Sequence, residues 1–162
     1  MAARAKAGIP GQGTHMNKVA LVIGAGDATG GAIARRFARE GFTACITRRD
    51  VGKLSGLKAT IESAGGTCHA FGSDARDEEA AIRLFADIES TIGPIEVCAF
   101  NIGGNVRFGI TETTARVYRK VWEMCAFAGF LAGREAAKAM LPRKRGTIIF
   151  TGATASLRGG SG

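Results

Sequence analysis

The sequence is poor in the residues that usually hold metal ions. It has two histidines among 162 residues, and its four cysteines form no C-x-x-C pair. A zinc site needs closely spaced Cys and His ligands, so we predict no bound metal. Three of the four cysteines lie in apolar stretches. We therefore interpret them as free, mostly buried thiols of a protein in a reducing compartment: Cys45, Cys68, Cys98 and Cys125.

Long apolar runs are also absent. No stretch approaches the ~20 apolar residues of a membrane span, and no secretory apolar segment precedes the first apolar run. We therefore expect a soluble, cytoplasmic protein with no membrane partner. Aromatic residues make up 7% of the chain, and no basic stripe is interleaved with them. This argues against nucleic acid as a partner, although the formal net charge is +8.

The first 15 residues contain Arg4 and Lys6 but no acidic residue. We interpret residues 1–16 as a flexible basic tail and residues 17–162 as one domain. A cloning remnant, a start upstream of Met16 and a transit peptide all stay open as explanations of this tail.

Short apolar runs alternate with amphipathic helical stretches after the tail. The runs predict five buried strands, at residues 18–24, 42–47, 67–72, 95–101 and 146–152. The alternation predicts right-handed βαβ units with helices on both faces of a parallel sheet. The expected fold is therefore α/β, a doubly wound sheet of the Rossmann type.

Four helices are expected between these strands. The first covers residues 30–40, and the second turns Leu54, Leu57 and Ile61 inward. The third begins at an Asp77 cap and turns inward Ile82, Phe85 and Ile88. The fourth is one long helix from about Thr114 to Pro142.

Glycines follow the first predicted strand, in the stretch GAGDATGGAIA. Glycine allows a sharp turn and a close approach of amide groups to a pyrophosphate, and the helix that follows points its N-terminus at the anion. A tight turn without a ligand is the alternative. We predict a diphosphate site made of Gly24, Gly26, Asp27, Ala28, Thr29 and Gly30.

With this loop the chain resembles the short-chain dehydrogenase/reductase family over residues 18–162. The family's loop reads T-G-x-x-x-G-x-G, and here Ile23 stands for the Thr and Ala28 for the second glycine. The resemblance implies hydride transfer between a nicotinamide dinucleotide and a small carbonyl or alcohol.

Two further motifs match the family in order. Asp74 and Ala75 follow the third predicted strand, where the family's aspartate meets the adenine ring. Asn101, Ile102 and Gly103 follow the fourth, and match the family's Asn-Ala-Gly element beside the coenzyme. By resemblance, all five residues bind the coenzyme.

The end of the second predicted strand bears on the choice of coenzyme. An acidic residue there would bind the ribose diol of NAD and repel a 2′-phosphate. Here Thr47 is followed by Arg48 and Arg49, whose guanidinium groups suit a phosphate. We predict NADP as the coenzyme, with NAD less favoured. In the alternative, both arginines are solvated surface charges and Asp50 pairs with one of them.

The family's catalytic groups are missing. It uses Tyr-x-x-x-Lys, but the only tyrosine here is Tyr118, which we interpret as a helix-face residue, and position 122 is Trp. Cys125 stands at the position of the family's Asn and Ala153 at that of its Ser. Thr154 or Ser156 could replace that Ser if the loop register shifts. We name no catalytic residue.

Accordingly, we expect the chain as it stands to be inactive. Both a fragment and a natural short form stay open, as does a non-catalytic nucleotide-binding or scaffold protein. We also expect a homo-oligomer, because the last strand has an open edge and the long helix is apolar on several sides: Val117, Val121, Trp122, Phe127 and Phe130.

Overall fold

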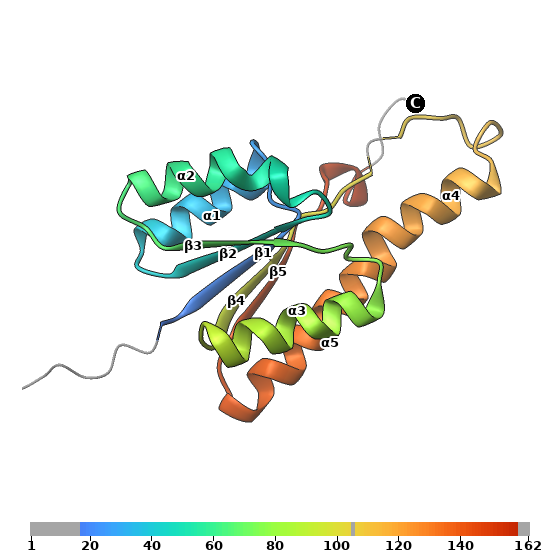
Figure 1. The fold of residues 1–162 in the computed structure, drawn as a ribbon. Helices are drawn as coiled ribbons and strands as arrows, with labels where there is room; N and C mark the ends of the chain where they lie inside the picture. Colours follow the sequence, from blue (N-terminus) through green and yellow to red (C-terminus); the bar gives the residue numbers. More distant parts are fainter. Residues whose placement is uncertain (1–16, 105, 159–162) are drawn as a thin grey trace, which may run out of the picture.

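The structure is a computed structural model that describes residues 17–104 and 106–158. Five strands form one parallel sheet in the order β3-β2-β1-β4-β5 (Figure 1). The strands are β1 (Val19–Ile23), β2 (Thr43–Arg48), β3 (Cys68–Gly72), β4 (Ile95–Phe100) and β5 (Thr147–Phe150). The predicted α/β class and the five parallel strands are confirmed. The predicted tail, residues 1–16, lies outside the described residues.

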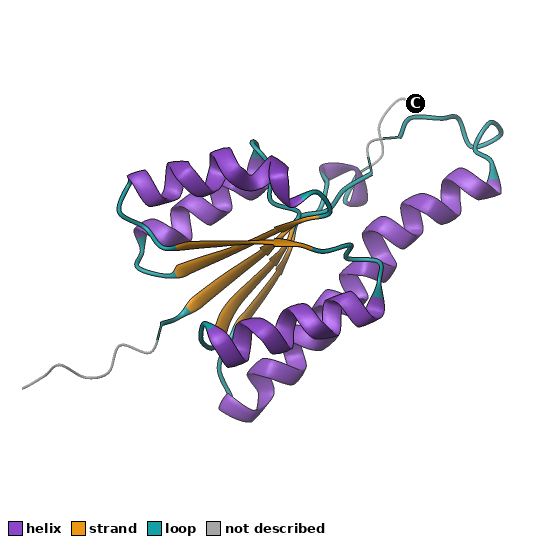
Figure 2. Ribbon diagram, viewed as in Figure 1, coloured by secondary structure: helices purple, strands orange, loops and turns teal. Residues whose placement is uncertain are grey.

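Helices cover both faces of the sheet (Figure 2). On one face lie α1 (Thr29–Arg39) and α2 (Ser55–Ser63), the latter preceded by a 3-10 turn at Val51–Leu54. On the other face lie α3 (Glu78–Thr91) and α5 (Ala128–Met140). The chain moves outward from β1 to β3 and then returns to place β4 on the other side of β1. The strand order therefore reverses between β1 and β4, which is where doubly wound folds leave a crevice.

The central strands are buried on both faces. Every residue of β1 and β4 is buried, as expected of strands covered by helices on both sides. The prediction of a buried fifth strand is wrong. In β5 only Ile148 is half-buried, and Thr147, Ile149 and Phe150 are exposed. This strand lies at the edge of the sheet, and β4 is its one partner among the described strands.

The third helix begins as predicted, and two of the three side chains predicted to face inward are buried. Asp77 caps it, with Oδ1 accepting a hydrogen bond from the Ala80 N–H at 3.0 Å. The prediction that Ile82 points inward is wrong, because this side chain is 36% exposed. Phe85 and Ile88 are buried as predicted, and the buried positions of the helix are Ala81, Leu84, Phe85 and Ile88.

The predicted long helix is interrupted. It begins with α4 (Ala115–Trp122), which Thr114 caps through its Oγ1 at 3.3 Å from the Val117 amide nitrogen. A π-helical turn at Glu123–Phe127 then leads into α5, and Pro142 lies in the 3-10 turn that ends it. Single π turns of this kind occur mostly inside α-helices and frequently at functional sites. In Figure 1, α4 extends beyond the sheet, and it buries no residue.

The four cysteines are free thiols, as predicted. Cys45, Cys68 and Cys98 are buried, and Cys125 is half-buried. Desolvation raises the pKa of Cys45 and of Cys98 from 9.0 to about 12. Across residues 17–104 and 106–158, no three His, Cys, Asp or Glu side chains are placed to hold a metal ion. No helix in the same two ranges is long and apolar enough to cross a membrane.

Candidate functional site

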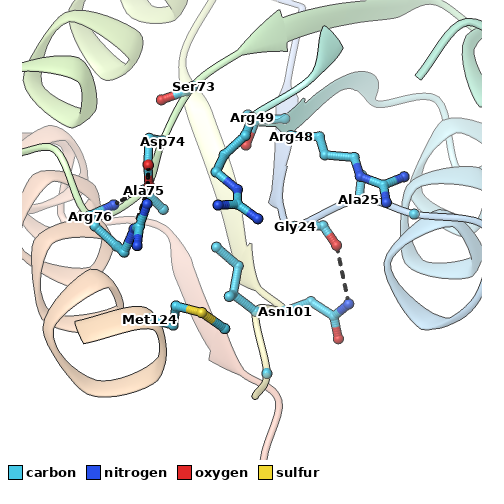
Figure 3. Close-up of a pocket in the computed structure, with 14 residues that line it drawn as sticks. Gly24, Ala25, Arg48, Arg49, Ser73, Asp74, Ala75, Arg76, Asn101 and Met124 are labelled. Carbon is cyan, nitrogen blue, oxygen red and sulfur yellow. Dashed lines mark hydrogen bonds and ion pairs between the residues drawn. The ribbon is translucent and has the colours of Figure 1, made fainter. Parts of the chain in front are cut away.

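A cavity of about 300 Å³ opens beyond the carboxyl ends of β1 to β4 (Figure 3). The chain segments that follow these four strands supply most of its lining, and Met124 of the π turn supplies another part. The cavity thus lies at the reversal of strand order, where α/β sheets bind their ligands. The predicted site residues that line it are Gly24, Gly26, Arg48, Arg49, Asp74, Ala75, Asn101, Ile102 and Gly103.

The turn after β1 can be made only with glycine at position 24. Gly24 has a φ of +85°, and a Cβ there would lie 2.7 Å from both the carbonyl oxygen of Asn101 and the Cγ1 of Ile102. The N–H groups of Gly24 and Ala25 donate to the carbonyl oxygen of Thr47 at 3.2 and 3.0 Å. Asn101 Nδ2 donates to the Gly24 carbonyl oxygen at 3.3 Å, as Figure 3 shows. The turn is therefore fixed to both neighbouring strands.

Helix α1 begins directly behind this turn. Gly30, in its first turn, is buried, and a Cβ there would lie 2.5 Å from the Gly24 carbonyl oxygen. Asp27, Ala28 and Thr29 are exposed at the start of the helix and do not line the cavity. Ala28 gives the helix no side-chain cap, and the first turn holds no acidic residue. The N-terminal amide groups therefore keep their partial positive charge for an anion.

Arg48 and Arg49 are exposed and line the cavity. The alternative in which Asp50 pairs with one of them is wrong. Asp50 Oδ1 instead accepts from the Gly52 N–H at 3.1 Å, and Oδ2 lies 3.7 Å from Lys53 Nζ. No carboxylate of the described residues forms an ion pair with either arginine. Both guanidinium groups are thus available to a ligand.

Asp74 is bound on both oxygens by Arg76, a residue that the sequence interpretation missed. Oδ1 accepts from the Arg76 backbone N–H at 3.1 Å and from Nε at 3.0 Å, and Oδ2 accepts from Nη2 at 2.6 Å. These hydrogen bonds hold the pKa of Asp74 below its usual value, and the nearby charge of Arg49 lowers this pKa further. The signal was present, since an Asp often binds the amide two residues later.

Three residues considered for catalysis do not line this cavity. Tyr118 is 68% exposed on α4, which confirms that it is a helix-face residue. Cys125 lies beside Gly104, where a Cβ would approach its Sγ to 3.7 Å. Ala153 is exposed before the 3-10 turn Thr154–Ser156, and the Ser156 Oγ donates to its carbonyl oxygen at 2.6 Å. The Ser156 hydroxyl is thus engaged locally.

Comparison with known proteins identifies related sequences and folds. A family model described as short chain dehydrogenase matches residues 18–162. The crystal structure of a short-chain dehydrogenase from Rhodopseudomonas palustris is 53% identical, with a TM-score of 0.85, and the match covers 90% of this chain and 68% of that one. A metagenomic short-chain oxidoreductase solved in complex with NADP is 29% identical, with a TM-score of 0.79, and the match covers 83% of this chain and 62% of that one.

A curated relative has a defined activity. The 2,3-dihydro-2,3-dihydroxybenzoate dehydrogenase of Bacillus subtilis is 28% identical over 140 residues. The match covers 86% of this chain and 53% of that protein. The chain therefore spans about half the length of this relative.

Proposed function

The chain belongs to the short-chain dehydrogenase family, and from this premise we propose that it binds NADP(H) in preference to NAD(H) in the cavity beyond β1 to β4. One observation carries the proposal. The cavity is lined by a glycine turn at a helix N-terminus and by Arg48 and Arg49, for which the described residues supply no carboxylate partner. A dinucleotide with a 2′-phosphate is the ligand that uses both features.

The residues present fit such a coenzyme. Gly24 and Gly30 allow close backbone contacts that a Cβ would block, and the amide groups at the N-terminus of α1 would bind a diphosphate. Arg48 and Arg49 would hold the 2′-phosphate. Asp74 with Ala75 would meet the adenine, and the segment from Asn101 to Gly103 would line the nicotinamide ribose.

The coenzyme, when bound, supplies the donor or acceptor of a hydride, and the proposed substrates of the family reaction are small carbonyls or alcohols. The 162 residues lack the partner groups for that reaction. A proton donor must reach the developing alkoxide, but Tyr118 is exposed on α4 and does not line the cavity, and no lysine follows it at position 122. Cys125 and Ala153 replace the polar side chains of the family. We therefore propose that this chain binds the coenzyme without turning over a carbonyl.

A non-catalytic role in nucleotide binding is the second candidate function, and the same replacements favour it. In this role the coenzyme would be a structural or sensing ligand. A panel of carbonyl substrates with NADPH distinguishes the two candidates, because turnover on any of them would exclude the non-catalytic role.

Calorimetric titration of the 162-residue chain with NADPH and with NADH tests the coenzyme proposal. We expect heat of binding with both and the lower Kd for NADPH. Equal or tighter binding of NADH would refute the role of the arginines, and no heat with either would refute the site itself.

The predictions of a homo-oligomer and of a cytoplasmic location stay predictions. The exposed aromatic rings of Trp122, Phe130 and Phe150 favour the first of them. Size-exclusion chromatography with light scattering checks it, and a mass equal to one chain would contradict it.

A further inference from the structure

Arg76 is the one cation of the cavity lining that has an ion pair within the described residues. Three arginines and one carboxylate line the cavity, and the carboxylate of Asp74 pairs with Arg76 alone. The pair is bidentate, through Nε at 3.0 Å and Nη2 at 2.6 Å, and both side chains are about one-third exposed. Figure 3 shows this pair on one side of the cavity and Arg49 pointing into the space beside it.

Arg49 is close enough to Asp74 for its charge to lower the pKa of that carboxyl. A carboxylate beside an unpaired guanidinium forms a bidentate pair when no better donor holds it. Arg76 is that better donor here, since its own backbone N–H fixes Asp74 Oδ1 at 3.1 Å. The charge of Glu123 also attracts Arg76, toward the π turn.

From this arrangement we propose that Arg76 is a specificity-determining residue: it holds the Asp74 carboxylate away from Arg49, so that Arg49 stays unpaired for the 2′-phosphate of NADP(H). This inference rests on the proposed function, since it concerns the same coenzyme. Arg76 acts through Asp74 and Arg49 and is therefore a positioning residue. No contact between Arg76 and the phosphate is required.

The ratio of the Kd for NADH to the Kd for NADPH isolates this effect. Both coenzymes carry the same adenine, so any change in how Asp74 or Ala75 meets that ring alters both Kd values and leaves their ratio unchanged. The ratio therefore reports only on the group at the 2′ position of the adenosine ribose, a phosphate in NADPH and a hydroxyl in NADH, and a general loss of structure would not lower it selectively.

The test measures this ratio by titration of the 162-residue chain. We expect Arg76→Ala to lower the ratio about tenfold, as far as Arg49→Ala does, because charge-assisted contacts to one guanidinium are lost in both variants. Arg76→Ala should cause no further fall in a chain that already carries Arg49→Ala. The double variant Asp74→Asn with Arg76→Ala should regain the wild-type ratio. Arg83→Ala is the matched control, because Arg83 lies on α3 with only Glu79 at 4.0 Å.

Several results would overturn the inference. Arg76→Ala could leave the ratio unchanged, or lower it equally in the Arg49→Ala background, or fail to be rescued by Asp74→Asn. If Arg76→Ala does not fold, Asp74→Asn alone decides: the ratio must stay at or above the wild-type value, and a fall overturns the inference. A wild-type chain that does not prefer NADPH would instead sink the proposed function, so the two failures are distinguishable.

Discussion

Replacing Arg48 and Arg49 with alanine removes the two guanidinium groups that have no carboxylate partner among the described residues. No ion pair within that part of the chain has to be broken when they bind a phosphate, so the loss should appear in full as lost affinity. A hydrogen bond to a charged group contributes about 1.5–3 kcal/mol. Both side chains are exposed, so solvent screening favours the lower end of this range.

About 1.5 kcal/mol for each arginine corresponds to about tenfold in Kd for each, and to about a hundredfold for both. We therefore expect the double variant to bind NADPH about a hundredfold more weakly and NADH with little change. Salt should reduce the wild-type preference as well, because the Debye length falls from about 10 Å at 0.1 M to about 3 Å at 1 M.

The assay is a calorimetric titration of both coenzymes at low and high salt. Arg36→Ala is the matched control, since Arg36 is an exposed arginine of α1 that pairs with Glu40 at 2.9 Å. It should change neither Kd. The reasoning is refuted if the double variant loses NADH affinity as severely as NADPH affinity, because the arginines would then support the site as a whole.

Four other predictions test the fold and the glycine turn. Gly24→Ala should abolish coenzyme binding and lower the melting temperature, because the new Cβ would lie 2.7 Å from the carbonyl oxygen of Asn101 and the backbone φ is +85°. Gly26→Ala is the control: no atom lies within 4 Å of a Cβ at this position, so this variant should keep the wild-type melting temperature. Arg143→Ala should lower the free energy of unfolding by about 1–3 kcal/mol in urea, because this side chain donates hydrogen bonds of 2.7, 3.0 and 3.1 Å to α3 and β4. An effect as small as that of the exposed Arg83→Ala would contradict it. A thiol reagent should modify Cys125 in the native chain and all four thiols only in denaturant. Folding raises the pKa of the Cys45 and Cys98 thiols from 9.0 to about 12. Their contribution to the free energy of unfolding should therefore be full below pH 9 and decline as the pH rises toward 12. Stability that does not decline over this range would contradict their burial.

The periodicity of apolar residues was sufficient to predict the order and type of the main elements. Continuous apolar runs such as residues 19–23 occur where a strand is covered on both faces, and β1 is buried throughout. The prediction of which side chains of α3 face inward was wrong at Ile82. An apolar side chain at the edge of a helical stripe fits the apolar periodicity whether or not it is buried. The interruption of the long helix by a π turn leaves no mark in the composition of residues 115–140.

The sequence was sufficient to predict which segments form the site, but not which side chains in it contact one another. Strand ends of a parallel sheet meet at one edge, so Gly24, Arg49, Asp74 and Asn101 could be expected to lie together. Pairing among charged side chains depends on rotamers and distances that spacing alone does not give. Asp50 is adjacent to Arg49 in sequence, yet its carboxylate binds a turn amide and Lys53 instead.

The proposed coenzyme site and the positions that the family resemblance assigns to catalysis lie in different segments of this chain. Apart from Met124, every residue that lines the cavity lies at the carboxyl end of β2 or in a segment that follows β1, β2, β3 or β4, between residues 24 and 103. The two positions that the family resemblance assigns to polar catalytic groups, Cys125 and Ala153, lie outside that lining. Their replacement therefore leaves the glycine turn and the arginines intact. For this reason a measured affinity for NADPH would establish the coenzyme site whatever the outcome of a turnover assay, and a lack of turnover would carry no weight against the site.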